Sequence, residues 1–256
     1  MSLLHALVLG IVEGITEFLP VSSTAHLILA THVLGLDSEF IKSFEIIIQL
    51  GAILSVVVLY WKKFWHWETL KKLVVAVIPT GVIGLTVYKA LKAHLLGNLT
   101  VVLLSLVIGG IALILFERFR TTGEASDAEV DLSQVTYGKA FLVGLFQAIA
   151  IIPGVSRSAA TIVGGSLIGI SKRTIVEFSF MLAVPTMLAA TGLELVKSRA
   201  ALAGHYDVLA VGFIVSFLTA IIAIKSFLGY IKTRSFAAFG WYRIVLAAVY
   251  WLVFLR

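Results

Sequence analysis

Two glutamates lie four residues apart near the start of the chain. Glu13 and Glu17 belong to an apolar segment that predicts a helix, so both carboxylates project from one face, one turn apart. This pair suits a divalent cation or a general base. Two acids within one turn repel each other, and each is costly in an apolar segment, so we favour a functional role over a structural one.

A run of hydroxyl side chains follows the two acids. It comprises Ser22, Ser23 and Thr24. Pro20 ends the preceding helix, and serine is a good N-cap for a new one. Free N–H groups at a helix N-terminus bind anions, above all phosphate, although such a run by itself often serves only as a cap. His26 lies on the first turn of the new helix and is expected to face the same cavity as Glu17.

Arg157 is the sharpest single feature of the second half of the chain. It is flanked by Ser156 and Ser158 and follows Pro153 and Gly154. A guanidinium pairs with a phosphate through two parallel hydrogen bonds, so we count Gly154, Ser156, Arg157 and Ser158 as candidate phosphate-binding residues. The structural alternative is a clasp between Arg157 and one of the two glutamates, which would leave the serine-rich helix ends without a ligand.

The composition places these residues in a membrane protein. Of 256 residues, 60% are hydrophobic and 13% are charged, which leaves too little polar surface for a water-soluble enzyme. The absence of cysteine excludes disulfides, thiolate metal sites and cysteine nucleophiles. The net charge of +6 indicates basic cytoplasmic loops rather than a nucleic-acid partner.

Six apolar runs are long enough to cross a bilayer as helices. We expect them at 40–61, 73–88, 98–116, 174–196, 207–228 and 238–255. No cleavable signal peptide is expected, because the first apolar stretch has no basic leader and contains two acids. Lys42 with Glu45 and Arg173 with Glu177 are expected to form helical ion pairs near a membrane edge.

Two further apolar stretches, 2–36 and 136–171, are each broken in the middle and predict re-entrant helical hairpins. They align without a gap at an offset of 134 positions. The offset places Ala6, Gly10, Val21, Ser22, Ala25, Gly35, Ile41 and Phe44 on Ala140, Gly144, Val155, Ser156, Ala159, Gly169, Ile175 and Phe178, and Glu13 on Gln147. We therefore predict one all-α integral membrane domain built as an inverted-topology repeat: residues 1–118, a polar linker at 119–135, and residues 136–256.

Basic residues predict the orientation of this domain. One side carries Lys62, Lys63, Lys71, Lys72, Arg118, Arg120, Lys139, Lys172, Arg173, Lys232 and Arg234. The other carries Lys89, Lys92, Lys197, Arg199 and Arg256. The richer side should be cytoplasmic, so both termini and the mouth of the first hairpin are expected to face outward.

The two motifs resemble a known family. Residues 13–26, EGITEFLPVSSTAH, and residues 153–158, PGVSRS, are similar to the paired motifs of the BacA-type undecaprenyl-pyrophosphate phosphatases, and the similarity covers essentially the whole chain. The resemblance implies hydrolysis of undecaprenyl diphosphate to the monophosphate in the bacterial inner membrane, with a divalent cation, Mg²⁺ or Ca²⁺. It implies that Glu13 and Glu17 form the acidic, metal-binding motif, His26 and Ser23 the catalytic pair, and Arg157 the phosphate-binding arginine.

The attacking group stays open at this stage. His26 could act as nucleophile or base, Ser23 could be a nucleophile activated by His26, or a glutamate could activate water. The alternative function is a transporter that flips a prenyl-phosphate lipid without hydrolysis, because inverted repeats with broken helices are typical of carriers. A homodimer is also considered.

Overall fold

The computed structural model describes residues 1–95, 98–119, 130–197 and 204–255, and every regular element within them is a helix. Six long helices are apolar enough to cross a membrane. They are α3 (Glu39–Phe64), α4 (Trp67–His94), α5 (Leu99–Phe119), α8 (Lys172–Lys197), α10 (Tyr206–Thr233) and α11 (Ala237–Phe254). The six predicted spans are confirmed. The span expected at 73–88 is the middle part of the longer helix α4, which also passes through Pro79 without ending there.

Each predicted hairpin consists of two short helices around a break. The first has α1 (Leu3–Thr16) and α2 (Ser23–Val33), and the second has α6 (Tyr137–Ala148), the 3₁₀ turn η2 (Ile149–Ile151) and α7 (Arg157–Leu167). At 1.5 Å per residue, none of these helices exceeds about 21 Å, which is too short for a hydrocarbon core of about 30 Å. The arrangement is compatible with re-entrant hairpins.

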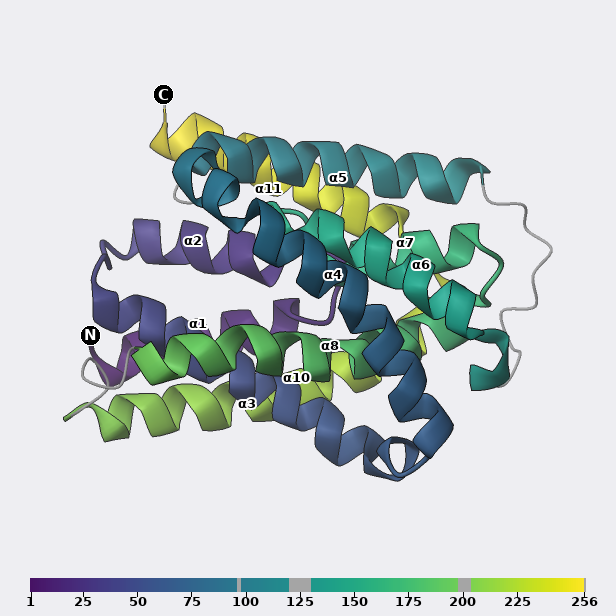
Figure 1. The fold of residues 1–256 in the computed structure, drawn as a ribbon. Helices are drawn as coiled ribbons and strands as arrows, with labels where there is room; N and C mark the ends of the chain where they lie inside the picture. The colour runs from purple at the N-terminus through teal and green to yellow at the C-terminus, as the bar shows by residue number, and fades with distance from the viewer. Residues whose placement is uncertain (96–97, 120–129, 198–203, 256) are drawn as a thin grey trace.

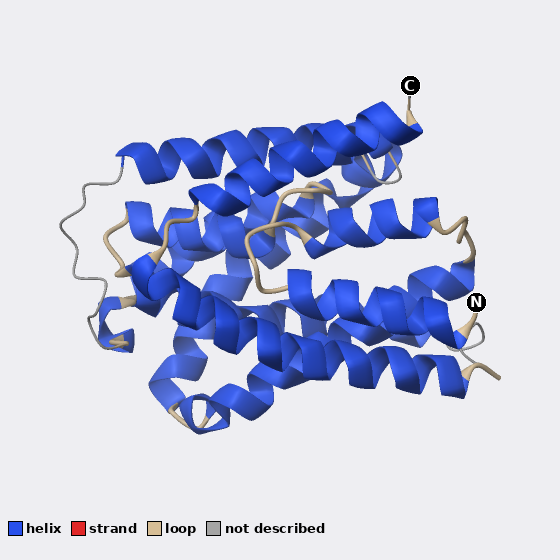
Figure 2. Cartoon of the chain, turned by 180° about the vertical axis from the view of Figure 1, so that it is seen from behind, coloured by secondary structure: helices blue, strands red, loops and turns tan. Residues whose placement is uncertain are grey.

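The two halves of the chain interlock. Helix α1 packs on α10 of the second half, and α6 packs on α4 of the first half. Helices α5 and α11 also pair across the halves and form one outer layer, with α1, α3, α8 and α10 opposite and the short α2, α6 and α7 between them (Figure 1). Seen from behind, the two irregular breaks lie at the centre of the molecule (Figure 2). The packing of helices from each half of the chain on helices of the other half is compatible with an inverted repeat.

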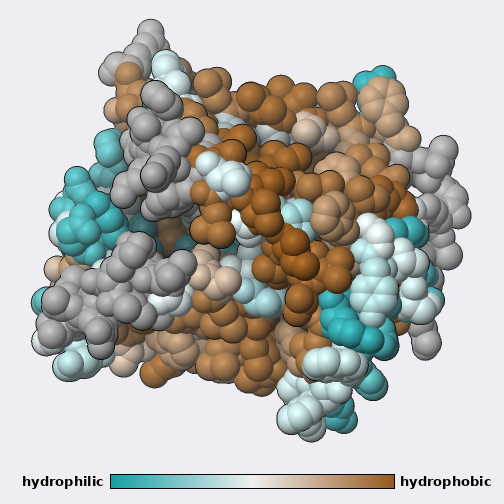
Figure 3. Space-filling view, viewed as in Figure 1, coloured by the Kyte–Doolittle hydropathy of each residue, from teal (hydrophilic) through white to brown (hydrophobic). Residues whose placement is uncertain are grey.

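The surface has an apolar band between polar ends (Figure 3). Large hydrophobic side chains are exposed on the outer helices, among them Leu85 on α4 and Ile108 on α5, as expected for contact with lipid. The chain is therefore a multi-pass membrane protein. Both termini lie at one end of the bundle (Figure 1).

Most of the basic residues of the richer side lie at the opposite end. Here Lys72 Nζ donates to the Leu132 carbonyl next to the 3₁₀ turn η1 (Leu132–Gln134), and Lys172 Nζ donates to the Arg234 carbonyl. The central part of the predicted linker, 120–129, lies outside the described residues, as do Arg120, Arg199 and Arg256.

Of the two expected helical ion pairs, one forms. Arg173 Nε lies 4.0 Å from Glu177, whose second oxygen contacts Lys63 of α3. The expected pair of Lys42 with Glu45 is replaced by Lys42 with Glu39, at 2.8 Å. Glu39 lies one turn before Lys42 at the exposed start of α3, whereas Glu45 is partly buried, so the shorter and better hydrated pair is favoured.

Candidate active site

Glu13 lies in the last turn of α1 and Glu17 is the C-cap residue of this helix, one turn further on, and both side chains are buried. Each oxygen of the Glu17 carboxylate has a protein partner: one accepts a hydrogen bond from Ser23 Oγ, and the other lies 2.7 Å from Arg157 Nη2. Glu13 is completely buried, and neither of its carboxylate oxygens has a hydrogen-bond partner. The two acids predicted as one site therefore differ, with Glu17 paired and Glu13 lacking any protein donor.

The second half of the chain provides an internal reference for Glu13. Gln147 of α6, which aligns with Glu13 in the predicted repeat, is equally buried, but its amide nitrogen donates to Thr80 Oγ1 at 2.9 Å and Thr186 Oγ1 at 3.1 Å. Because buried polar groups are nearly always satisfied, the contrast points to a cation or a proton at Glu13.

The first break turns the chain from α1 into α2. Ser22 adopts φ 71°, a conformation that non-glycine residues rarely take, and its hydroxyl caps α2 by accepting from the Ala25 N–H at 3.4 Å. Ser23 begins the helix and points its hydroxyl back to Glu17. Backbone strain of this kind is concentrated at functional sites.

The second break has the same cap. Ser156 Oγ accepts from the Ala159 N–H at 3.1 Å, so Arg157 becomes the first residue of α7. Gly154 has φ 89°, and a Cβ there would meet α5, so this turn requires glycine. Ser158 Oγ donates to the Leu19 carbonyl at 2.8 Å and thereby joins the two breaks directly.

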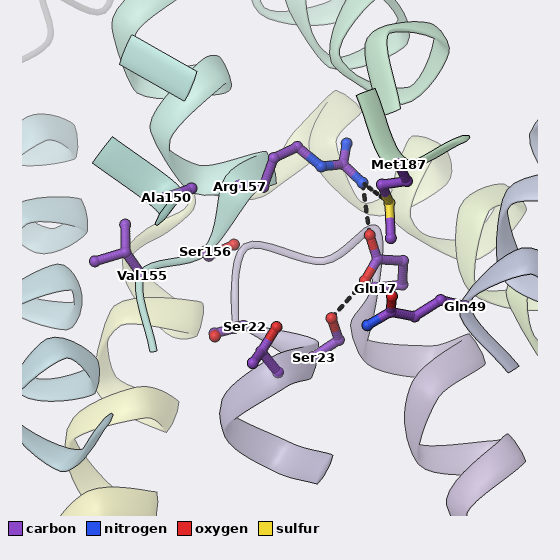
Figure 4. Close-up of a pocket in the computed structure, with 10 residues that line it drawn as sticks. Glu17, Ser22, Ser23, Gln49, Ala150, Val155, Ser156, Arg157 and Met187 are labelled. Carbon is purple, nitrogen blue, oxygen red and sulfur yellow. Dashed lines mark hydrogen bonds and ion pairs between the residues drawn. The ribbon is translucent and has the colours of Figure 1, made fainter. Parts of the chain in front are cut away.

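Arg157 reaches from α7 toward α1 (Figure 4). Besides its ion pair with Glu17, Nη1 donates to the Ser179 carbonyl at 2.9 Å, and Nε has no partner although it is buried. The Phe18 ring lies 5.8 Å from the guanidinium carbon. The arginine is therefore held by Glu17 and the Ser179 carbonyl, and its Nε has no protein partner.

A cavity of about 100 Å³ opens beside this ion pair, which is room for a phosphoryl group (Figure 4). It is lined by Glu17, Ser22, Ser23, Thr24, Gln49, Ala150, Val155, Ser156, Arg157 and Met187. Six of these were predicted from the motifs. Gln49 of α3 and Met187 of α8 were missed, since nothing near them in sequence marks a site. Gly154, Ser158 and Glu13 support the site without lining this cavity.

The structure orients His26 away from the expected position. Its Nδ1 lies 2.8 Å from the Ser22 carbonyl and its Nε2 lies 2.7 Å from Tyr242 Oη on α11, and the imidazole does not line the cavity that contains Glu17. A carbonyl only accepts, so Nδ1 carries a proton, and when the ring is neutral Nε2 accepts from the tyrosine hydroxyl. The expected contact of Ser23 with His26 is replaced by the contact of Ser23 with Glu17.

Tyr242 borders a second, much larger and mostly apolar cavity of about 730 Å³ between α1, α10 and α11. Leu19 and Val21 of the first break line it, as do Phe227 and Phe239. The polar and apolar cavities thus lie on two sides of the same break.

One more charged group was missed by the sequence analysis. Arg243 lies inside the predicted span 238–255 and is 1% exposed. An arginine within a membrane segment is costly, so its place in an apolar run was a signal that could have identified it.

Known proteins are similar to this chain over nearly its whole length. The family model described as bacitracin resistance protein BacA matches residues 6–249. A protein of Aquifex aeolicus named undecaprenyl-diphosphatase is 50% identical over 98% of both chains. Proteins of the same name are 51% identical in Bdellovibrio bacteriovorus, over 97% of this chain and 95% of the relative, and 45% identical in Campylobacter jejuni, over 98% and 94%. With its paired acidic and arginine motifs meeting at one cavity, the chain belongs to the BacA bacitracin-resistance family.

Proposed function

We propose that this protein hydrolyses undecaprenyl diphosphate to undecaprenyl monophosphate and inorganic phosphate, which returns the lipid carrier to cell-wall synthesis. The relatives' name, undecaprenyl-diphosphatase, supports hydrolysis and gives no support to transport. The observation that carries the proposal is the meeting of Arg157 and Glu17, from opposite halves of the chain, beside a cavity lined by the hydroxyls of two helix N-termini.

Three features of this geometry support phosphate binding. The N-termini of α2 and α7 both lie at the cavity, and the free backbone N–H groups of a helix N-terminus favour an anion. Arg157 adds a fixed cation with a free Nε donor. These groups oppose the charge on the terminal phosphoryl group as its bond to the bridging oxygen breaks and a new P–O bond forms.

The contacts of Ser23 narrow the choice of attacking group. The Ser23 hydroxyl donates to Glu17, so Glu17 could accept this proton as a general base and make Ser23 the nucleophile. Alternatively, Glu17 could accept a proton from a water molecule, which would then attack the phosphorus directly. His26 needs a rearrangement first, because Tyr242 occupies its Nε2 lone pair. We therefore favour Ser23 or water over His26 as the attacking group.

A divalent cation, Mg²⁺ or Ca²⁺, fits the acidic pair. The two unpartnered oxygens of Glu13 beside Glu17 are the hard ligands that such cations take. Among the described residues no three His, Cys, Asp or Glu side chains gather as a metal site, so substrate phosphate oxygens or water would complete the coordination. When bound, the cation would neutralise charge on the diphosphate. Glu13 would hold it, and Glu17 would hold it as well as orienting Arg157.

The apolar cavity supports a prenyl substrate. It touches the first break through Leu19 and Val21, next to the residues of the phosphate cavity, so a chain attached to the diphosphate could lie there.

We further propose a location in the bacterial inner membrane with the basic end in the cytoplasm and the active site open to the outer face. A homodimer stays a prediction, and native mass spectrometry from detergent would test it.

The test is phosphate release from undecaprenyl diphosphate by the purified protein in detergent. Glu17→Gln and Arg157→Ala should each abolish release while the thermal unfolding curve keeps its shape. Lys63→Met, which breaks an ion pair at the far end of α3, is the control and should stay active. Trapping labelled phosphate on Ser23, on His26 or on neither identifies the attacking group. Full activity in either site variant would refute the assignment.

A further inference from the structure

Arg243 occupies the interior of the molecule beside both helix breaks. Its guanidinium donates to four backbone carbonyls from three segments. Nε donates to Leu106 at 3.3 Å, Nη2 to Ser105 at 2.9 Å and Gly154 at 3.0 Å, and Nη1 to Pro20 at 3.5 Å. All three nitrogens are thus used, and the side chain joins α5 and α11 to the two breaks.

The neighbouring helix α5 leaves room for this side chain. Gly109 of α5 leaves the space that the guanidinium fills, since a Cβ there would collide with it. In the described part of the chain no carboxylate forms an ion pair with Arg243, so carbonyl dipoles alone balance its charge. A buried cation without a counter-ion is a costly way to hold helices together, and apolar packing would serve better. Its presence here therefore points to a role that depends on those particular carbonyls.

Two of the four carbonyls belong to the irregular turns themselves. Pro20 lies two residues before Ser22, the one described non-glycine residue with positive φ. Gly154, also at positive φ, lies three residues before Arg157. Strained backbone persists only where its surroundings hold it firmly, and Arg243 contacts both turns through one rigid, planar group.

We infer that Arg243 is a positioning residue, which fixes the two helix breaks relative to each other so that Ser23 and Arg157 face the same phosphoryl group. It does not line the cavity beside the ion pair of Arg157 with Glu17, so we do not expect it to contact the phosphoryl group. The catalytic consequence rests on the proposed phosphatase function, whereas the structural consequence does not. Two further contacts join the breaks, the hydrogen bond from Ser158 to the Leu19 carbonyl and the ion pair of Arg157 with Glu17, but neither of them bonds the strained turns at Pro20 and Gly154.

Kinetics give the first test. Arg243→Lys keeps the charge, but an ammonium cannot reach four divergent carbonyls, so kcat should fall by about 10²-fold, as expected for a displacement of about 1 Å, while KM stays within about threefold. Arg243→Met, which removes the donors altogether, should lose at least as much. Lys63→Met is the matched control for the loss of a basic side chain that joins helices away from the breaks. Wild-type kcat in Arg243→Lys, or a change in KM alone, would overturn the inference.

A distance measurement tests the same inference without any substrate. The chain has no cysteine, so spin labels on Val33→Cys and Leu167→Cys, at the exposed ends of α2 and α7, would be the only ones. We expect a single narrow distance distribution in the otherwise wild-type protein and in Lys63→Met, and a broadened or shifted one in Arg243→Lys and Arg243→Met. A fall in kcat with an unchanged distribution would refute positioning. If the wild-type protein released no phosphate, a broadened distance distribution in the Arg243 variants would still support the positioning role of Arg243. Only the proposed phosphatase function would then be refuted.

Discussion

Replacing Glu13 and Gln147 by methionine, one at a time, should change stability in opposite directions. The two positions align at the offset of 134 residues and are equally buried, and methionine has a similar length to both side chains. Gln147 loses two hydrogen bonds, to Thr80 and Thr186, at about 0.5–1.5 kcal/mol each, so Gln147→Met should destabilise the protein by about 1–3 kcal/mol.

Glu13 accepts no hydrogen bond that the substitution would remove. Removing a buried unsatisfied carboxyl should stabilise the protein by about 1–3 kcal/mol in the absence of divalent cations, and relief of repulsion with Glu17 acts in the same direction. At about 2–4 °C per kcal/mol, the expected shifts are about 2 to 12 °C, upward for Glu13→Met and downward for Gln147→Met.

The assay is thermal unfolding in detergent with a chelator, repeated with Mg²⁺ or Ca²⁺, alongside phosphate release. A cation at 100 times its Kd should stabilise wild type and Gln147→Met by about 2.7 kcal/mol and leave Glu13→Met unchanged. Glu13→Met should release no phosphate, whereas Gln147→Met should stay active. A Glu13→Met protein that is less stable than wild type in chelator, or that still responds to the cation, would refute this account of Glu13.

Further substitutions separate the other parts of the site. Arg157→Lys should lower kcat/KM by about 10²–10³-fold, because one ammonium cannot bond both Glu17 and the Ser179 carbonyl and still face the phosphate; steady-state phosphate release measures this, and a loss below tenfold would contradict it. Ala223→Phe, which fills part of the apolar cavity, should raise KM for undecaprenyl diphosphate more than for a short farnesyl diphosphate; equal changes for both would argue against a prenyl chain in that cavity. Tyr242→Phe should change kcat by less than tenfold if Ser23 or water attacks, and a larger loss in the same assay would restore His26 as the candidate.

The sequence alone predicted the parts of this protein that depend on local chain chemistry. The serines predicted where the second helix of each hairpin begins, because a capping hydroxyl acts within one turn, and Ser22 and Ser156 are the N-caps. The preceding helices end at Thr16 and Ala148, four and five residues before the prolines that were expected to end them. Apolar runs located six spans, since the thickness of a bilayer sets their length. The repeat predicted that the two broken segments meet, and the contact of Glu17 with Arg157 is in accord with that prediction.

Only the tertiary structure decided which groups are partners. The Glu13 and Gln147 positions look alike along the chain, but threonines from α4 and α8 satisfy Gln147 alone. His26 turned to Tyr242, which lies 216 positions away, and Arg243 found carbonyls in three separate segments. Side-chain direction in a packed interior is set by neighbours from distant parts of the chain, and helical periodicity carries no information about them.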